Sequence, residues 1–324
     1  MFKTRITELL GIEYPIIGGT MMHLSRSEFT ASISQAGGLG ILASANYQDK
    51  ESFRQAIRNI RDMTGRPFAV NLNMFPARKR LDNHLYIDVI LEEGVGIVET
   101  SGHKAPEEYM ARLKEGEVTL IHKCVGVRYA RKAEVLGADA VTVVGYENGG
   151  ATGVLDITTL CLVPRVVDNV TVPVIAGGGV CDGRGMAAVL SLGADGVIMG
   201  TRFLLAEECP LHPAVKEALA SAKELDTMLV MRSVGNTHRV WKNQAAEKAA
   251  HMEERGATLE ELFQVISGDQ AKKMYFQGDI DAGLIACGQG IGLAGDIKPV
   301  REIMTDIIEE ASKARERLNS MKNS

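Results

Sequence analysis

The chain has 324 residues, 45% of them apolar, and a formal net charge of −5. This length suits one large α/β domain, or one domain with an insertion. The charge argues against a nucleic-acid-binding protein, no apolar run approaches the ~20 residues of a membrane span, and the N-terminus lacks the apolar core of a signal peptide. The five cysteines are scattered along the chain, which favours a reducing cytoplasm over a disulfide scaffold or a zinc site.

Eight short apolar segments rich in valine and isoleucine predict the strands of a parallel sheet. They lie near 14–18, 38–44, 68–73, 97–101, 119–124, 140–145, 172–176 and 196–200. Strands that are apolar on both faces are typical of a sheet covered by helices on both sides. Helical patterns separate them, as at 52–61, where Phe53, Ile57 and Ile60 share one face. Eight such units predict a TIM (β/α)8 barrel. The first strand lacks the Gly-x-Gly-x-x-Gly turn of an open dinucleotide-binding sheet.

The alternation stops after the eighth segment. Residues 207–276 show helical patterns without strands, and we predict a small helical cap there. An insertion after strand 8 lies on the C-terminal face of a barrel, where barrel chemistry occurs. Two amphipathic helices near 282–294 and 298–319 should complete the barrel wall. The expected domains are therefore a barrel of residues 1–206 and 277–324 and a cap of residues 207–276.

Two glycine-rich turns predict a phosphate site. Gly178 and Gly179 follow the seventh strand, and Gly200 and Thr201 follow the eighth. Glycine lets the backbone approach a ligand closely, and a helix N-terminus offers unpaired N–H groups. The loops after strands 7 and 8 of a barrel form such a site. The alternative is that both are ordinary tight turns between a strand and a helix, with no role in binding phosphate.

Other strand ends carry candidates for catalysis. Lys123 ends the fifth strand, where its charge could hold an anionic ring or form a Schiff base; the alternative is a lysine paired with a neighbouring carboxylate. His122 should be a core histidine. His23, in the loop after the first strand, is the better acid–base candidate because imidazole titrates near neutral pH. The alternative is a solvated loop histidine. No histidine pair has metal-binding spacing, so we expect no metal.

Taken together, these segments resemble the FMN-dependent nitronate monooxygenase (2-nitropropane dioxygenase) family, which also includes NADH:quinone reductases and flavin-type enoyl-acyl-carrier-protein reductases. The resemblance covers nearly the whole chain. Its motifs are Thr4-Arg-Ile-Thr-Glu-Leu-Leu-Gly-Ile-Glu-Tyr-Pro-Ile, Ala36-Gly-Gly-Leu-Gly, Pro67-Phe-Ala-Val-Asn, His122-Lys-Cys, Ala176-Gly-Gly-Gly-Val-x-Asp-Gly-Arg-Gly, Gly200-Thr-Arg-Phe and Gln277-Gly-Asp-x-Asp-x-Gly. It implies a TIM barrel that binds FMN without a covalent bond.

The resemblance also implies which residues contact FMN. Lys123 matches the lysine beside the N1–C2=O edge of the ring, where a positive charge would stabilise the anionic reduced flavin. The remaining matches are Gly178, Gly179, Gly200 and Thr201 at the phosphate; Gly19, Thr20, Met21, Gly150 and Ala151 beside the ring system; Asn71 at the ring or ribityl chain; and Gln277 in a motif near the cofactor.

One loop departs from the family pattern. The family's strand-6 loop usually reads Glu-x-Gly-Gly-His-x-Gly, and that histidine is its usual catalytic acid or base. This chain has Ala151 in its place. The loss weighs against simple nitronate oxidation. Reduction of a quinone or a conjugated alkene by NADH or NADPH tolerates it better, because hydride transfer depends more on stacking and position.

Two alternatives from other classes stay open. An IMP-dehydrogenase-like barrel shares the phosphate-site pattern, but its cysteine nucleophile is missing from residues 146–153. A catalytically silent FMN-binding protein is the other. We expect an FMN-dependent oxidoreductase in which His23 and Lys123 are catalytic. Its partner should be a small-molecule substrate, a nitronate or another conjugated compound, with no nucleic acid or membrane involved, and a homodimer is left open.

Overall fold

The computed structural model describes residues 2–75, 82–102 and 104–321. Within these residues eight parallel strands form one sheet in the order β1-β9-β8-β6-β5-β4-β3-β2. The strands are β1 (Ile16–Gly18), β2 (Gly40–Ala43), β3 (Phe68–Asn73), β4 (Ile97–Ser101), β5 (Thr119–Cys124), β6 (Ala140–Val144), β8 (Val174–Gly177) and β9 (Gly196–Met199). Each lies within or next to a segment predicted from the sequence.

The sheet curls until its two edge strands nearly meet. β1 pairs with β9, with Ile16 opposite Val197. On its other side, a single bridge joins Ile17 to Leu39, just before β2. The Gly18 N–H donates to the Leu39 carbonyl at 2.9 Å. These contacts confirm the predicted TIM barrel.

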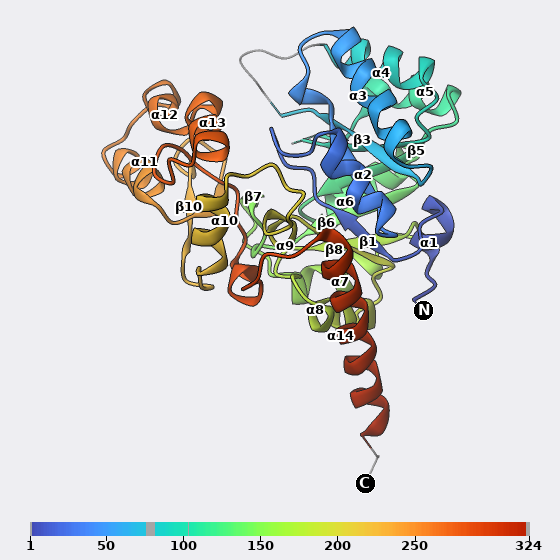
Figure 1. Ribbon diagram of the computed structural model, residues 1–324. Coiled ribbons are helices and arrows are strands. Elements are labelled where there is room, and N and C mark those ends of the chain that lie inside the picture. Colours follow the sequence, from blue (N-terminus) through green and yellow to red (C-terminus); the bar gives the residue numbers. More distant parts are fainter. Residues whose placement is uncertain (1, 76–81, 103, 322–324) are drawn as a thin grey trace.

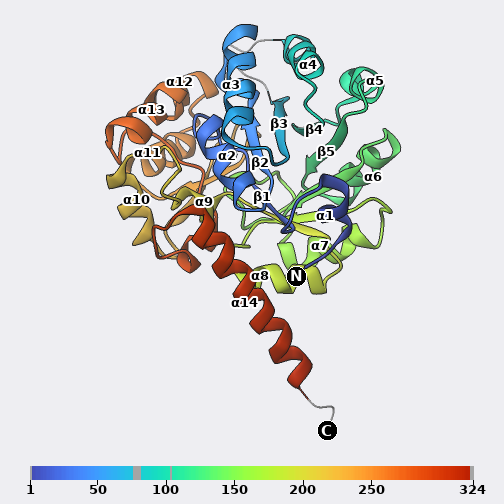
Figure 2. The same ribbon diagram turned by 45° about the vertical axis from the view of Figure 1, so that its right-hand side comes forward.

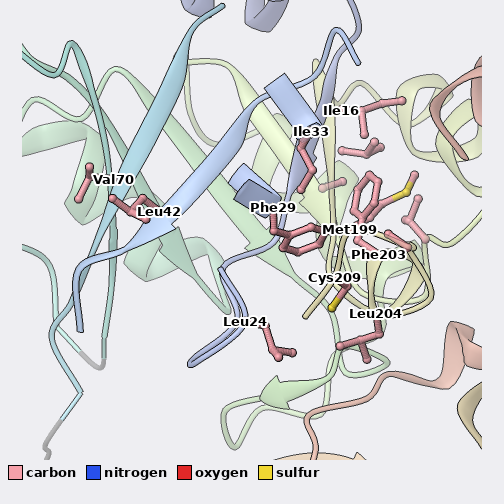
Figure 3. Packing of buried hydrophobic residues seen from close by; sticks show 14 of the residues in the cluster. Ile16, Leu24, Phe29, Ile33, Leu42, Val70, Met199, Phe203, Leu204 and Cys209 are labelled. Carbon is pink, nitrogen blue, oxygen red and sulfur yellow. The ribbon is translucent and has the colours of Figure 1, made fainter. Parts of the chain in front are cut away.

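Helices cover the outside of the barrel. Buried apolar residues fill the layer between them and the strands, and Figure 3 shows Phe29 and Ile33 of α2 among residues of β1 and β9. A second cluster joins strand residues to α1, whose Ile6 lies against the start of β9 at Gly196. The helices of this part are α1 (Arg5–Leu10), α2 (Ser27–Gln35), α3 (Lys50–Met63), α4 (Asn83–Glu92), α5 (Glu107–Glu115), α6 (Val127–Val135), α7 (Thr159–Val167), α8 (Gly183–Ser191) and α9 (Thr201–Leu204), with a 3₁₀ turn at η1 (Ser44–Asn46).

The cap contains a sheet, so the prediction of helices alone for residues 207–276 is wrong. β10 (Thr227–Val230) and β11 (His238–Trp241) form an antiparallel hairpin, and β11 pairs in turn with β7 (Gly150–Ala151) from the loop after β6. Figure 1 shows β7 between the barrel and the cap. Apolar residues of the hairpin pack on two cap helices, which explains why such short strands are stable. The cap helices are α10 (Pro213–Ala220), α11 (Gln244–Glu254), α12 (Leu259–Ile266) and α13 (Gly268–Gln277).

The predicted helix at 282–294 is also wrong. Only a 3₁₀ turn, η2 (Gln289–Leu293), forms there, because Gly283, Gly288, Gly290 and Gly292 are too frequent for a stable helix. The last helix, α14 (Val300–Ser320), agrees with its predicted range of 298–319. It packs against α8 and extends past the barrel, as Figure 2 shows. No helix among the described residues is long and apolar enough to cross a membrane.

Candidate active site

Side chains from three neighbouring strands and the loop after β1 meet at Glu99, a fully buried residue of β4. Lys123 Nζ on β5 lies 3.2 Å from Glu99 Oε1 and 3.3 Å from Oε2. The Asn71 amide on β3 donates to Oε2 at 2.7 Å, and the Thr20 hydroxyl donates to the same oxygen at 2.9 Å. The structure therefore brings together three residues predicted from the sequence, around a carboxylate that was missed.

The pairing with Glu99 defines what Lys123 can do. The lysine is held as a cation beside an anion, which is the alternative considered for it from the sequence. Schiff-base formation needs an uncharged amine, so this arrangement favours a fixed hydrogen-bond donor. Its side chain is 21% exposed, whereas that of Glu99 is 0% exposed. The ammonium group is thus the member of the pair that a ligand can reach.

The turn after β8 is shaped for a close backbone approach. Gly178 and Gly179 have φ values of +91° and +74°, a conformation that favours glycine. The Thr159 hydroxyl donates to the Gly178 carbonyl at 2.7 Å, and the Glu147 carboxylate accepts from the Thr159 N–H at 3.0 Å. No hydrogen bond within the described residues uses the Gly179 N–H. Thr159 and Glu147 therefore hold the turn in place, and the Gly179 N–H remains available as a donor to a ligand.

The turn after β9 completes this region. A Cβ added at Gly19 would lie 3.2 Å from Gly200 Cα, and one added at Gly200 would lie 4.0 Å from Met21 Sδ. The structure thus places the loop after β1 against Gly200. The Thr201 hydroxyl accepts a hydrogen bond from the Gly288 N–H at 2.9 Å.

The segment Cys287–Gly290 is a further part of the site that sequence reasoning missed. The Gln289 N–H donates to the Glu147 carbonyl at 2.9 Å. A Cβ on Gly290 would lie 2.4 Å from Cys181 Sγ. The segment therefore packs directly on the loops after β6 and β8. Its close glycines in Cys-Gly-Gln-Gly-Ile-Gly were the available signal.

The cluster of Lys123 and Asn71 around Glu99 and the glycine turns after β8 and β9 fit FMN. The braced glycine turn, with its unused N–H, suits a terminal phosphate. Lys123 offers a donor of the kind that the carbonyl edge of a flavin ring accepts, and Asn71, whose amide nitrogen donates to Glu99 and Ser101, holds the neighbouring carboxylate in place. Both groups lie at the C-terminal ends of barrel strands, the face on which barrel enzymes bind their ligands.

His23 lies between the barrel and the cap. Its backbone has φ +67°, and its N–H donates to the Asn46 side chain at 2.7 Å. The ring faces α13: its centroid lies 6.4 Å from that of Tyr275, and Nε2 would lie 3.3 Å from a Cβ on Gly268. Burial lowers the pKa of His23 to about 4. The imidazole is therefore neutral at pH 7, and its catalytic role stays a prediction.

The remaining predicted residues lie in three places. Gly150 and Ala151 form β7 and pair with the cap strand β11. Gln277 ends α13 with an exposed side chain, and no contact among the described residues joins it to the other predicted sites. His122 is buried, lies 2.9 Å from the Thr100 hydroxyl through Nδ1, and has a pKa lowered to about 4 by desolvation. The expectation of a core histidine at His122 is confirmed.

Comparison with known proteins identifies the relatives of this chain. The family model described as nitronate monooxygenase matches residues 3–310. A (3aS,4S,5R,7aS)-5-hydroxy-7a-methyl-1-oxo-octahydro-1H-indene-4-carboxyl-CoA dehydrogenase from Rhodococcus jostii is 31% identical over 99% of both chains. A probable nitronate monooxygenase from Staphylococcus aureus is 32% identical, with 78% of this chain and 81% of the relative covered. FabK from Thermotoga maritima is 36% identical over 98% of this chain and 99% of its own, with a TM-score of 0.91. A nitroalkane oxidase from Streptomyces ansochromogenes is 27% identical over 97% of this chain and 99% of its own, with a TM-score of 0.83.

Proposed function

Because this chain belongs to the nitronate monooxygenase family of FMN-dependent oxidoreductases, we propose that it reduces a conjugated carbon–carbon double bond beside a carbonyl group, with NADH or NADPH as the electron source. The observation that carries the proposal is Ala151. The strand-6 loop keeps its glycines and pairs with β11, but the side chain of Ala151 cannot move a proton. A reaction centred on hydride transfer tolerates that change.

The relatives support a thioester as the carbonyl compound. The Rhodococcus jostii protein, a dehydrogenase of a carboxyl-CoA compound by name, matches 99% of both chains. The Staphylococcus aureus protein, named a probable nitronate monooxygenase, matches 78% of this chain. We therefore propose an enoyl thioester, or a smaller enone, as the substrate class.

The residues present define how FMN would be held. The turns at Gly178–Gly179 and Gly200–Thr201 would bind the phosphate, and Asn71 and Lys123 would contact the ring. When bound, FMN supplies a centre that accepts and donates hydride. Glu99 fixes the Lys123 ammonium in place and offsets its charge, so that the lysine positions the ring more than it attracts electrons to it.

Nitronate oxidation is the second candidate, favoured by the Staphylococcus and Streptomyces relatives. General acid–base groups typically contribute about 10²–10⁴-fold to rate, and the histidine that would supply such a group is replaced by Ala151. Oxygen uptake with propyl-2-nitronate or propionate 3-nitronate should therefore be slow. Fast oxidation would place nitronate turnover first.

An anaerobic spectral titration tests the proposal. The purified protein should carry flavin absorption bands, and the flavin released by heat should chromatograph as FMN. NADH or NADPH should bleach the bands, and an enoyl thioester or enone should restore them. Recovery of FAD would reject the cofactor assignment. Bleaching by neither nucleotide would reject the reductase.

A further inference from the structure

One hydroxyl group of the candidate site has its only hydrogen committed to the protein. Thr20 lies in the loop after β1, and its Oγ1 is 2.9 Å from Glu99 Oε2. The Asn71 amide nitrogen lies 2.7 Å from the same oxygen, and Lys123 Nζ lies 3.2 Å from Oε1 and 3.3 Å from Oε2. Each carboxylate oxygen thus faces a cationic or amide donor, which is the pattern that an ionised carboxylate accepts. Thr20 therefore also donates to Glu99.

The direction of this hydrogen bond determines what Thr20 offers to a ligand. A hydroxyl has one hydrogen and two acceptor lone pairs. Because the hydrogen of Thr20 points to Glu99, only its lone pairs remain for another partner. Thr20 is half-buried, whereas Glu99 is 0% exposed, so the threonine is the member of this pair that a ligand can reach. A ligand that binds to the Thr20 hydroxyl must therefore bring a donor.

The backbone on both sides of Thr20 is fixed. The Gly19 N–H donates to the carbonyl of the last β9 residue at 2.8 Å, and a Cβ on Gly19 would lie 3.2 Å from Gly200 Cα. On the other side, the Met21 N–H donates to the Ser25 hydroxyl at 2.9 Å. The backbone that carries the hydroxyl is thus bonded to β9 and to its own loop, while the side chain reaches the buried carboxylate.

Thr20 and Lys123 place an acceptor and a donor next to each other. Both bond to Glu99 Oε2, the hydroxyl at 2.9 Å and the ammonium at 3.3 Å. The pyrimidine edge of a flavin carries the opposite pattern, because its C2 carbonyl accepts and the neighbouring N3–H donates. A ligand with a carbonyl group alone would bind to Lys123 and leave Thr20 without a donor. The pair therefore complements an edge on which a carbonyl stands beside an N–H group.

We propose that the Thr20 hydroxyl accepts a hydrogen bond from N3–H of FMN and so determines which group of the ring edge faces Lys123. The inference rests on the FMN site of the proposed function and not on its substrate or electron source. A cation alone does not distinguish the acceptors of the flavin edge, which are N1 and the two carbonyl oxygens. An acceptor beside the cation admits only N3–H, and a neighbouring carbonyl is then left for Lys123. Thr20 would thereby set the position of the ring, on which hydride transfer depends.

A double-mutant cycle with a modified cofactor tests the contact. The native apoprotein and Thr20→Val, which keeps the shape of the side chain, are each titrated with FMN and with 3-methyl-FMN. A methyl group replaces the N3 hydrogen in 3-methyl-FMN. Thr20→Val should weaken FMN binding about 2- to 12-fold, the range that one hydrogen bond represents. The preference of the native apoprotein for FMN over 3-methyl-FMN should fall by the same factor, because the variant has no acceptor to lose.

Two further variants control for effects of shape. Thr20→Ser keeps the hydroxyl and should retain both the FMN affinity and the preference for FMN over 3-methyl-FMN. Thr30→Val makes the same substitution at a buried threonine of α2, whose hydroxyl has no hydrogen-bond partner among the described residues. This second variant should alter neither quantity.

The reduction potential identifies which flavin group binds to Thr20. N3–H is present in both the oxidised and the reduced flavin, so Thr20→Val should leave the potential unchanged within error. N5–H exists only in the reduced flavin, and an acceptor there would favour reduction. A lower potential in Thr20→Val would therefore place the hydroxyl at N5 and overturn the assignment to N3.

The outcomes of the titrations separate this proposal from the proposed function. If Thr20→Val weakens the binding of FMN and of 3-methyl-FMN equally, or of neither, the contact is overturned. Equal affinities of the native apoprotein for both flavins overturn it without a variant. If Thr20→Val does not fold, Thr20→Ala replaces it in the cycle, with the same results expected. Bleaching by neither NADH nor NADPH would reject the reductase but would not change these affinities.

Discussion

The barrel and the cap contribute to the site by different means. The barrel supplies backbone turns after β8 and β9 and an ion pair between Glu99 of β4 and Lys123 of β5. The cap supplies a strand, β11, that reaches the site only by pairing with two residues of a barrel loop. The barrel therefore carries the residues that fit a cofactor, while the cap borders them through one strand pairing.

The largest effect outside the cap should come from the glycine turn. Gly178 has φ +91°, and an added Cβ would lie 2.9 Å from the backbone of Gly145. Gly178→Val should displace the backbone that faces the phosphate; a loss of about 3 kcal/mol in FMN binding, the size of such strain and crowding effects, corresponds to a roughly 100-fold weaker affinity. Equilibrium titration of the apoprotein with FMN measures this. Gly65→Val is the control, since nothing lies within 4 Å of a Cβ there. Equal affinities would remove the turn from the cofactor site.

Acid should weaken the barrel through His122. Its pKa is lowered from 6.5 to about 4 by burial, so between those values the unfolded chain binds a proton that the folded chain does not. The free energy of unfolding should therefore fall as the pH drops from about 6.5 to 4, by roughly 3 kcal/mol at most. Urea unfolding at several pH values measures this. His122→Asn should reduce the slope over the same range without removing it, because the lowered pKa of His23 contributes as well, and an unchanged slope would contradict the prediction.

Opposite substitutions in the ion pair should move the flavin potential in opposite directions. Lys123→Met removes a cation near the ring and should lower the reduction potential and weaken FMN binding. Glu99→Gln removes the neighbouring anion and should raise the potential. Shifts on the order of 30 mV, equal to about 1.4 kcal/mol for two electrons, are expected in spectroelectrochemical titrations. Shifts of the same sign would mean that the pair acts through folding and not through charge.

The smallest effect should come from a surface ion pair between cap and barrel. Arg232 lies 2.6 Å from Asp156, and both side chains are more than a third exposed. Such pairs contribute little in water, so Arg232→Met should leave the melting temperature unchanged within error. Arg239→Met, which removes the buried contact with Tyr146, should lower it measurably. The reverse order would show that surface charges, and not the β7–β11 pairing, hold the cap in place.

The sequence predicted the barrel because each of its elements is encoded locally. At 68–73, 97–101 and 119–124, the apolar runs coincide with the observed strands. β7 could not be predicted in this way, because Gly150 and Ala151 have no strand preference and form a strand only when β11 lies alongside. Residues 237–244 fit a helical pattern as well as a short strand, and pairing with β10 and β7 makes this segment the strand β11.

The candidate site shows the same limit. Lys123 and Asn71 stood out as polar residues at strand ends, and both are in the observed cluster. Glu99, which Lys123 and Asn71 both contact, was not predicted, although a carboxylate inside an apolar strand was a signal for a buried polar cluster. The pairing of Ala151 with His238 of β11 gave no signal in the sequence, because it depends on a register between segments that are far apart along the chain.

The pairing of β1 with β9 has a consequence for biosynthesis. The first barrel strand bonds to the last one, with Gly18 opposite Met199. A ribosome makes the chain from its N-terminus, so β1 lacks this neighbour until most of the barrel has been synthesised. The loop at Gly19 then lacks the Gly200 turn against which it packs. The candidate cofactor site therefore assembles late in translation, and in shorter nascent chains the edge of β1 is unpaired.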